Sequence, residues 1–315
     1  MPSTLVIYNP IAGRGRAAAQ WPLVEQALRQ AGVEFDAVPT QAKLDAVRLA
    51  REAPGRYTAV VAVGGDGTVH EIVNGLLQAS KEGETIALGV VPLGNGDDFA
   101  KVIPPQAPVG GKPFEWPEAV RKIAGGQTHL FDAGRMVGDP PGRDAPDGIR
   151  YFANGMDVGF GAHAALNFTT IPRFLTGMTA YMATVLKTMI AYPTVRLSIQ
   201  LDEQPPFEQA TSMTAITNGR CFANGFWVCP QAEADDGLFD LMVADAVSRR
   251  TIIGLIPKIT HGTHLDDSHI KMYRARRVVL GSQAPLLVEA DGELPYKGTH
   301  RLELELLPSK LRVMV

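Results

Sequence analysis

Apolar residues in the first part of the chain form short uninterrupted runs, separated by longer segments that mix apolar and polar residues with helical spacing. Short runs rich in β-branched residues are typical of strands buried on both faces. They cover residues 5–8, 35–38, 59–63 and 86–91, and alanine-rich amphipathic stretches at 17–31 and 42–51 lie between them. This alternation predicts an α/β fold, a doubly wound parallel sheet with helices on both faces.

After about residue 131 the pattern changes to short β-like runs bounded by turn residues. These runs cover residues 151–153, 195–201, 211–216, 238–243, 277–280, 286–290 and 302–307. They predict an antiparallel β-rich domain with inserted helices at residues 174–192 and 250–260. We therefore expect two domains, residues 1–130 and 131–315. The last strand, at about 302–315, is free to pack back on the first domain.

The apolar segment 174–192 approaches the length of a membrane span. It contains Lys187, Gly177 and several threonines, and its bulky residues recur at steps of three and four. That period belongs to a one-sided helix, so the segment predicts a packed amphipathic helix rather than a transmembrane one.

Composition narrows the class of protein. A formal charge of -3 and a pI near 6.2 give no reason to expect nucleic-acid binding. Cys221 and Cys229 lack the spacing of a Cys-x-x-Cys pair or a zinc site, which predicts free thiols in a reducing compartment. The first residues lack a basic segment followed by a long apolar one, so we expect a cytoplasmic protein.

The run at 59–63 leads directly into Gly64-Gly65-Asp66-Gly67-Thr68. Three glycines in four positions, followed by a threonine at a helix start, let backbone amides approach phosphate oxygens closely. A carboxylate inside such a loop would repel phosphate unless a cation lay between them, so Asp66 is a candidate magnesium contact. A plain strand-to-helix turn would need neither the third glycine nor the long buried strand.

Two further loops follow buried strands and should open at the same edge of the sheet, where ligands bind. Gly94-Asn95-Gly96-Asp97-Asp98 follows the run at 86–91. Asn9-Pro10-Ile11-Ala12-Gly13-Arg14-Gly15-Arg16 follows the first strand and would bring Asn9 and the arginines near a nucleotide.

Together these motifs resemble the successive motifs of the diacylglycerol kinase catalytic-domain family, to which bacterial lipid kinases and sphingosine and ceramide kinases are related. Asn-Pro-x-Ala-Gly, Gly-Gly-Asp-Gly-Thr and Pro-Leu-Gly-x-Gly-x-Asp-Phe follow strands one, three and four. Asp235-Asp236-Gly237-Leu238-Phe239-Asp240 and Glu289-Ala290-Asp291-Gly292-Glu293 resemble the C-terminal signatures, so the resemblance extends over nearly the whole chain.

The resemblance implies an ATP- and magnesium-dependent lipid kinase. Its expected nucleotide contacts are Asn9, Thr40, Gly64, Gly65, Asp66, Gly67, Thr68, Val69, His70, Glu71, Gly94 and Asn95. Glu293 is similar to the proton acceptor of the family, and Asp236, with the carbonyls of Glu233 and Leu238, to a structural magnesium site. Where the family has Thr-Gly-Asn-Asp, this chain has Asn95-Gly96-Asp97-Asp98, which places an additional carboxyl at 97.

Considered without the resemblance, Asp291-Gly292-Glu293 is an acidic turn of a kind common in solvated hairpins. The other motifs favour the catalytic interpretation, because phosphoryl transfer needs a base near the acceptor hydroxyl. His70 and His163 have no partner at the spacing of metal ligands, and His261 and His264 have one only within a Gly/Thr-rich loop, so all four are expected to be structural or solvated.

Other interpretations remain open. NAD kinases and phosphofructokinase-like enzymes also carry Gly-Gly-Asp-Gly-Thr, and Gly13-x-Gly15-x-x-Ala18 imitates the fingerprint of a dinucleotide-dependent dehydrogenase. The expected partner is a lipid substrate. Arg249, Arg250 and Lys258 flank an apolar helix, which suits either transient contact with the inner face of a membrane or a core helix with solvated ends. A homodimer is also left open.

Overall fold

The computed structural model describes residues 3–103, 109–110, 112–141, 148–172, 175, 177–190, 194–221 and 225–315. Its N-terminal lobe contains β1 (Thr4–Tyr8), β2 (Phe35–Pro39), β3 (Ala59–Gly64) and β4 (Ala87–Pro92), with α1 (Arg16–Gln30), α2 (Asp45–Arg51), α3 (Asp66–Ala79) and α4 (Trp116–Gly125), and short 3-10 turns at Ala12–Gly15 and Phe99–Lys101.

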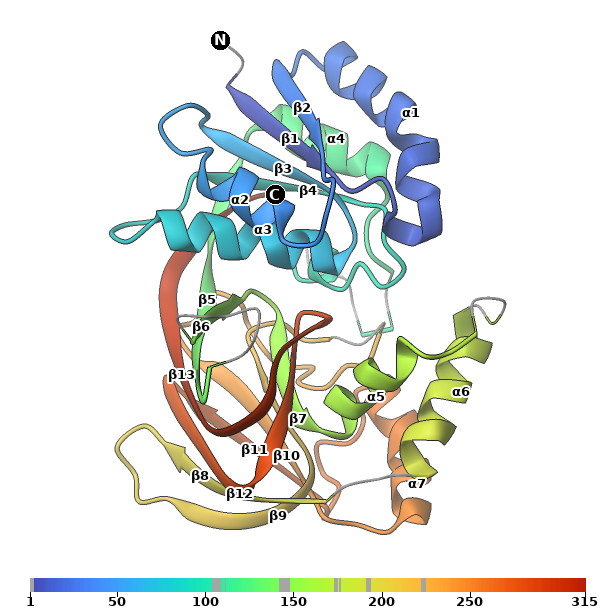
Figure 1. Ribbon diagram of the computed structural model, residues 1–315, viewed down its shortest axis with the longest axis vertical. Coiled ribbons are helices and arrows are strands. Elements are labelled where there is room, and N and C mark those ends of the chain that lie inside the picture. Colours follow the sequence, from blue (N-terminus) through green and yellow to red (C-terminus); the bar gives the residue numbers. More distant parts are fainter. Residues whose placement is uncertain are drawn as a thin grey trace.

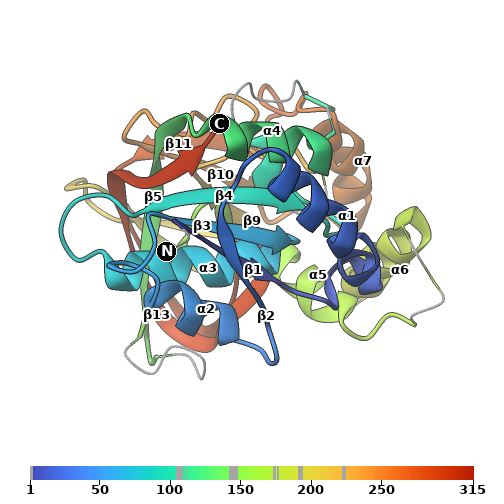
Figure 2. The same cartoon turned by 90° about the horizontal axis from the view of Figure 1, so that it is seen from above.

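The strands of this lobe run parallel in the order β2-β1-β3-β4. Every residue of β3 and β4 is buried, because α1 and α4 cover one face of the sheet and α2 and α3 cover the other (Figure 2). The uninterrupted apolar runs follow from this double cover. The predicted α/β fold is confirmed.

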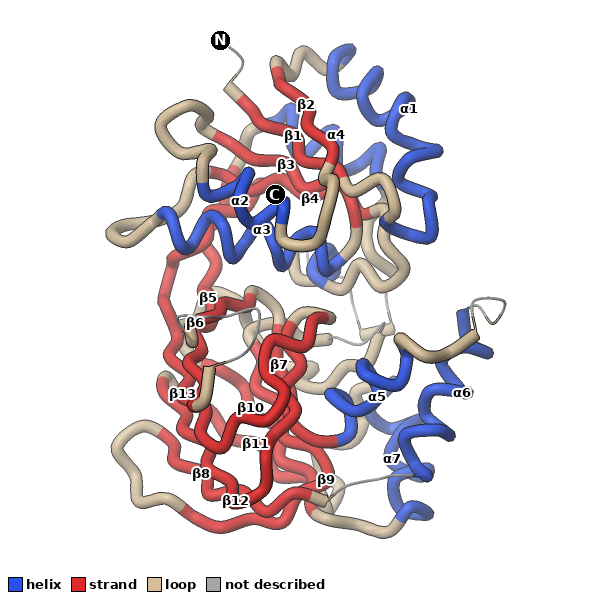
Figure 3. Tube along the Cα trace, viewed as in Figure 1, coloured by secondary structure: helices blue, strands red, loops and turns tan. Residues whose placement is uncertain are grey.

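The C-terminal lobe is β-rich, as predicted, and its helices gather on one side (Figure 3). Its strands are β5 (Thr128–Asp139), β6 (Ile149–Phe152), β7 (Gly155–Gly159), β8 (Val195–Leu201), β9 (Phe207–Thr217), β10 (Phe239–Asp245), β11 (Ile270–Ala275), β12 (Arg277–Ala290) and β13 (Glu293–Met314), and its helices are α5 (Phe160–Phe168), α6 (Gly177–Ile190) and α7 (Arg249–Thr260). The pairs within this lobe are antiparallel.

Several elements of this lobe differ from the sequence prediction. Two inserted helices were expected, and the described residues of this lobe contain three. Helix α5 was missed because it begins immediately after β7 and is too short to show a clear helical period. Strands β5, β7 and β11 were also not predicted. Residues 277–280 and 286–290 were expected as two strands, but both belong to β12, which continues through an irregularity after Gly281.

Strand β13 joins the lobes. Over its 22 residues it pairs with β12 and β5, and near its end Val313 pairs with Leu88 of β4. Leu311 and Val313 are buried in the N-terminal core, so the end of the chain lies in the upper lobe of Figure 1. One mixed sheet therefore runs through both lobes and holds them together.

Helix α6 is one-sided, as its period predicts. Its 14 residues bury Val185 and Met189 and expose Leu186 and Ile190. Parts of the predicted segment 174–192 beyond its ends lie outside the described residues. Among the helices that the structure describes, none is long and apolar enough to span a membrane.

Candidate active site

The glycine loops after β1, β3 and β4 meet at one edge of the sheet. The amide of Asn9 donates to the hydroxyl of Thr68 over 3.2 Å, which ties the first loop to the start of α3. A Cβ atom on Gly65 would lie 2.8 Å from the Cα of Gly94, so the two loops touch through bare backbone. This contact explains why both positions require glycine. The structure thus brings together Asn9, the loop 64–68 and Gly94.

Asp66 begins α3 and accepts a hydrogen bond of 3.1 Å from the backbone N–H of Phe99. The residue is partly exposed, yet its carboxyl group is surrounded by protein. Burial, followed by the negative charge of Asp98, raises the pKa of Asp66 to about 8, and Asp97 and Asp291 act in the same direction. A cation bound here would reverse that effect, because it favours the ionised carboxylate.

Asp97, the additional carboxyl of the β4 loop, points inward. It accepts the N–H of Gly94 over 2.8 Å and lies 3.4 Å from Arg16, which also donates to the carbonyl of Gly94. Burial raises the pKa of Asp97 to about 6, opposed by the Gly94 N–H and by Arg16. Asp97 therefore shapes the loop, while Asn95 is exposed beside it.

Glu293 reaches this loop from the other lobe. It begins β13, and its Oε1 lies 3.3 Å from the position that a Cβ atom on Gly67 would occupy. Its Oε2 lies 3.2 Å from Nζ of Lys43, in the segment between β2 and α2. The predicted base thus faces the predicted phosphate loop, although 226 positions separate Glu293 and Gly67 in the chain. Sequence reasoning did not single out Lys43, and no local motif marks it.

Asp291, in contrast, is buried and is not part of a solvated hairpin. Its carboxylate accepts the backbone N–H groups of Ala153, Asn154 and Gly155 at 2.8, 3.1 and 3.0 Å. Nδ1 of His70 lies 3.4 Å from the same carboxylate. These contacts fix the β12–β13 turn, so Asp291 positions Glu293. Its own carboxylate oxygens are already occupied by hydrogen bonds. The solvated-hairpin interpretation is therefore wrong for Asp291.

The remaining predicted nucleotide residues lie around α3 and β2. Thr40 follows β2 and donates its N–H to Tyr8, 2.9 Å away. Glu71 accepts the N–H groups of Leu44 and Ala46 at 3.0 and 3.2 Å and so anchors the start of α2. Val69 is buried in the core, where its side chain cannot reach a ligand at the sheet edge.

The second predicted magnesium position is elsewhere, at the turn before β10. Asp236 accepts the N–H of Leu238 over 3.0 Å and forms an ion pair with Arg274, and Glu233 is exposed nearby. Buried Asp132 accepts the N–H of Gly237 over 2.7 Å. Asp132 was not among the predicted site residues.

Carboxylate and carbonyl oxygens are the donors that magnesium prefers, so the residues fit the ion once Arg274 moves aside. Across the described ranges, no three His, Cys, Asp or Glu side chains are grouped to hold a metal. The predicted set has one carboxylate and two carbonyls, so its role stays a prediction.

The histidines and cysteines have structural surroundings. His264 is fully buried with Nε2 2.9 Å from the carbonyl of Val228, and Nδ1 of His163 lies 2.8 Å from the carbonyl of Gly159. Both cysteines are free, and burial raises the pKa of each thiol to about 12.

Comparisons with known proteins agree with this arrangement. Residues 3–136 match the diacylglycerol kinase catalytic domain, and residues 155–315 match the YegS C-terminal NAD kinase beta sandwich-like domain. The chain belongs to the diacylglycerol kinase family. Family membership favours a kinase over the dehydrogenase interpretation and implies use of a nucleotide.

Relatives of the family cover nearly the whole chain. A diacylglycerol kinase of Bacillus subtilis is 29% identical over 91% of this chain and 88% of its own length. A probable YegS-like lipid kinase of Pseudomonas aeruginosa is 28% identical over 98% of this chain and 92% of its own length.

Solved structures show the same fold. A diacylglycerol kinase from Bacillus anthracis matches with a TM-score of 0.72 at 19% identity, covering 99% of this chain and 96% of its own. An NAD kinase from Archaeoglobus fulgidus in complex with ATP matches with a TM-score of 0.53 at 12% identity, covering 99% of this chain and 93% of its own.

Proposed function

We propose that this protein transfers the γ-phosphoryl group of ATP to a hydroxyl group of a lipid such as diacylglycerol or a sphingoid base. The observation that carries the proposal is the approach of Glu293, from the C-terminal lobe, to Gly67 in the glycine loop. A base beside a phosphate loop suits phosphoryl transfer to an alcohol, where catalysis depends on positioning and charge neutralisation.

In this proposal the residues have separate tasks. The loop amides at 64–68, with Asn9, Thr40 and Asn95, hold the nucleotide, and Asp66 holds magnesium, which neutralises phosphate charge when bound. Glu293 accepts the proton of the lipid hydroxyl, and Lys43 orients Glu293. Asp236, with the carbonyls of Glu233 and Leu238, holds a second, structural magnesium ion.

The test is phosphate transfer from labelled ATP, with magnesium, to a lipid extract and a panel of pure lipid alcohols. NAD and fructose 6-phosphate are assayed beside them, because NAD kinases share the fold. We expect label only in lipid products. Label in NADP or in a sugar bisphosphate, with none in lipid, would contradict the proposal.

We also propose transient contact with the inner face of a membrane through α6 and α7. Leu186, Ile190 and Ile253 are 59%, 76% and 57% exposed, and exposed Lys187 and Arg250 adjoin them. The other face of α7 is buried at Ile252 and Leu255, so this helix is part core and part surface. Apolar side chains beside basic ones suit an anionic bilayer.

Vesicle sedimentation tests this contact. Binding should increase from neutral to anionic lipids and fall in Ile190→Ser, whereas unchanged sedimentation would contradict the idea. A cytoplasmic location and a homodimer stay predictions.

A further inference from the structure

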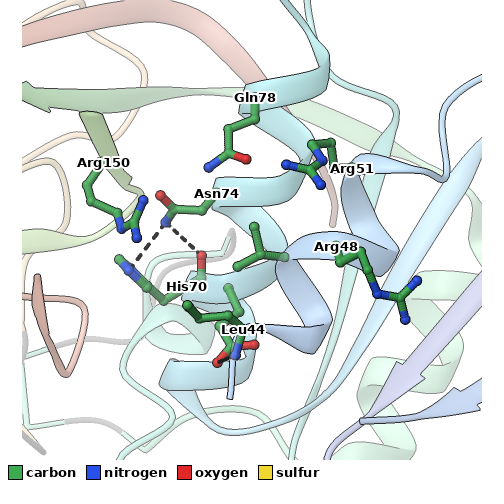
Figure 4. Close-up of a pocket in the computed structure, with 9 residues that line it drawn as sticks. Leu44, Arg48, Arg51, His70, Asn74, Gln78 and Arg150 are labelled. Atoms are coloured by element: carbon green, nitrogen blue, oxygen red, sulfur yellow. Dashed lines mark hydrogen bonds between the residues drawn. The ribbon is translucent and has the colours of Figure 1, made fainter. Parts of the chain in front are cut away.

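A pocket of about 200 Å³ lies beside α3, between α2 and β6 (Figure 4). Its lining residues are Leu44, Val47, Arg48, Arg51, His70, Glu71, Asn74, Gln78 and Arg150. A space of this size, lined by both apolar and charged side chains, has room for a small ligand. Two of the lining arginines come from different lobes, Arg51 from α2 and Arg150 from β6.

The lining carries an excess of positive charge. In the view of Figure 4, Gln78 lies between the guanidinium groups of Arg51 and Arg150, which line the same pocket. Nη1 of Arg150 also donates to the carbonyl of Ile149 over 3.2 Å. Arg48 turns away and pairs with Asp45 at 2.8 Å. The one carboxylate of the lining, that of Glu71, already accepts two backbone N–H groups.

The floor of the pocket is held rigidly. Buried Asn74 donates to the carbonyl of Tyr151 over 2.9 Å and accepts the N–H of Tyr151 over 3.0 Å. These two bonds join α3 to β6 next to Arg150. The backbone positions of the two arginines are therefore set by packed elements, so only their side chains need ordering when a ligand binds.

We propose that this pocket binds a phosphate group, either inorganic phosphate or the phosphate of a phosphomonoester, between Arg51 and Arg150. Guanidinium groups present planar donor forks that match phosphate oxygens, and two of them from separate elements suit a dianion. The pocket shares His70 and Glu71 with the predicted ATP segment. Gln78 lies seven residues beyond Glu71 on α3, roughly 10 Å further from the glycine loops.

A bound phosphate would join α2 to β6 and so strengthen the junction between the lobes. His70 lines the pocket on one side and faces Asp291, which positions Glu293, on the other. We therefore expect the occupied pocket to change turnover as well as stability. The effect on turnover rests on the proposed kinase function, whereas binding does not.

Calorimetry with sodium phosphate, at constant ionic strength, tests the site without substrate. We expect one site with a dissociation constant below about 1 mM, weakened roughly tenfold to a hundredfold in Arg51→Gln and in Arg150→Gln, as expected for lost charged hydrogen bonds. Arg150→Lys keeps the positive charge but loses the planar donor fork, so its affinity for phosphate should lie between those of wild type and Arg150→Gln. Arg121→Gln, exposed on α4 across the sheet, is the matched control and should bind as wild type does.

Three further arms sharpen the result. At tenfold excess over its dissociation constant, phosphate should raise the Tm of wild type by roughly 3 °C but not that of Arg51→Gln. Tighter binding of glycerol 3-phosphate would identify a soluble monoester, and tighter binding of vesicles containing phosphatidic acid would identify a lipid headgroup. Absent binding, equal binding by all variants, or one-for-one displacement by a magnesium complex of a non-hydrolysable ATP analogue would overturn the proposal.

Discussion

Asp66 and Asp236 are both followed by glycine, and both were predicted to contact magnesium, but their surroundings differ. Asp66 lies where the lobes meet, among the carboxylates of Asp97, Asp98 and Asp291, and its pKa is raised to about 8. Asp236 lies at a turn on the outside of the C-terminal lobe, where Arg274 neutralises it.

Under the proposed function, this difference would separate a site for chemistry from one for stability. Ionising a buried carboxyl group among like charges costs free energy, which a bound cation can offset, so Asp66 would gain most from a bound magnesium ion. Asp236 already has a cationic partner, and an exposed ion pair contributes about 0–1 kcal/mol. Magnesium would there exchange one cation for another and tie down the turn.

The largest expected effect comes from Asp66→Ala. Removal of the carboxylate should abolish phosphoryl transfer, because metal charge neutralisation supplies several kcal/mol to the transition state. Steady-state turnover with labelled ATP measures it, with an unchanged circular dichroism spectrum as control. A variant that keeps more than about a tenth of wild-type turnover would show that Asp66 holds no essential metal.

Glu293→Gln should lower turnover by about 10² to 10⁴, the usual contribution of general-base catalysis. Glutamine keeps the size of the side chain but not its basicity, so ATP affinity measured by calorimetry with magnesium should stay within a few-fold. Glu305→Gln, exposed on the same strand, is the matched control. If activity persists, or falls in step with ATP binding, Glu293 is not the base. Asp98 is then the next candidate, since Asp291 is saturated by backbone donors.

Asp236→Ala should lower Tm by a few degrees and remove any stabilisation by added magnesium. Arg274→Gln removes the competing cation instead, so it should raise the apparent affinity for magnesium in the same thermal melts. If wild type and both variants melt independently of magnesium, the segment is a plain polar turn. Asp236 would then contribute to stability alone and, unlike the role proposed for Asp66, would hold no metal.

A pH slope is expected as well. The pKa of Asp66 is about 8 in the folded protein against an ordinary 3.8, so the folded state binds the proton more tightly. The free energy of unfolding contributed by this group therefore falls as pH rises from about 4 to 8. Without magnesium, the Tm of Asp66→Asn relative to wild type should increase between pH 5 and 8. A constant difference would mean that Asp66 is ionised throughout.

Local pattern was enough for the N-terminal lobe, because β1, β3 and β4 are buried along nearly their whole length and their apolar runs coincide with the strands, while β2 is a mostly exposed edge strand. It was less informative for the C-terminal lobe. The buried residues of β5 include Asp132, Gly134 and Gly138, the two glycines in close contact with Phe152 and Tyr296, so its sequence shows no continuous apolar run. Its pairing with β13 depends on residues far away in the chain.

The sequence by itself determined the α/β class, the three glycine loops at one sheet edge and the family resemblance, because these depend on short-range periodicity and on motifs of a few residues. Only the tertiary structure decided which carboxylate of Asp291-Gly292-Glu293 faces the glycine loop and which is buried. It also brought Lys43 to Glu293 and Arg51 to the same pocket as Arg150. These contacts join segments distant in the chain, and their geometry depends on how β13 and α3 pack, which no local pattern encodes.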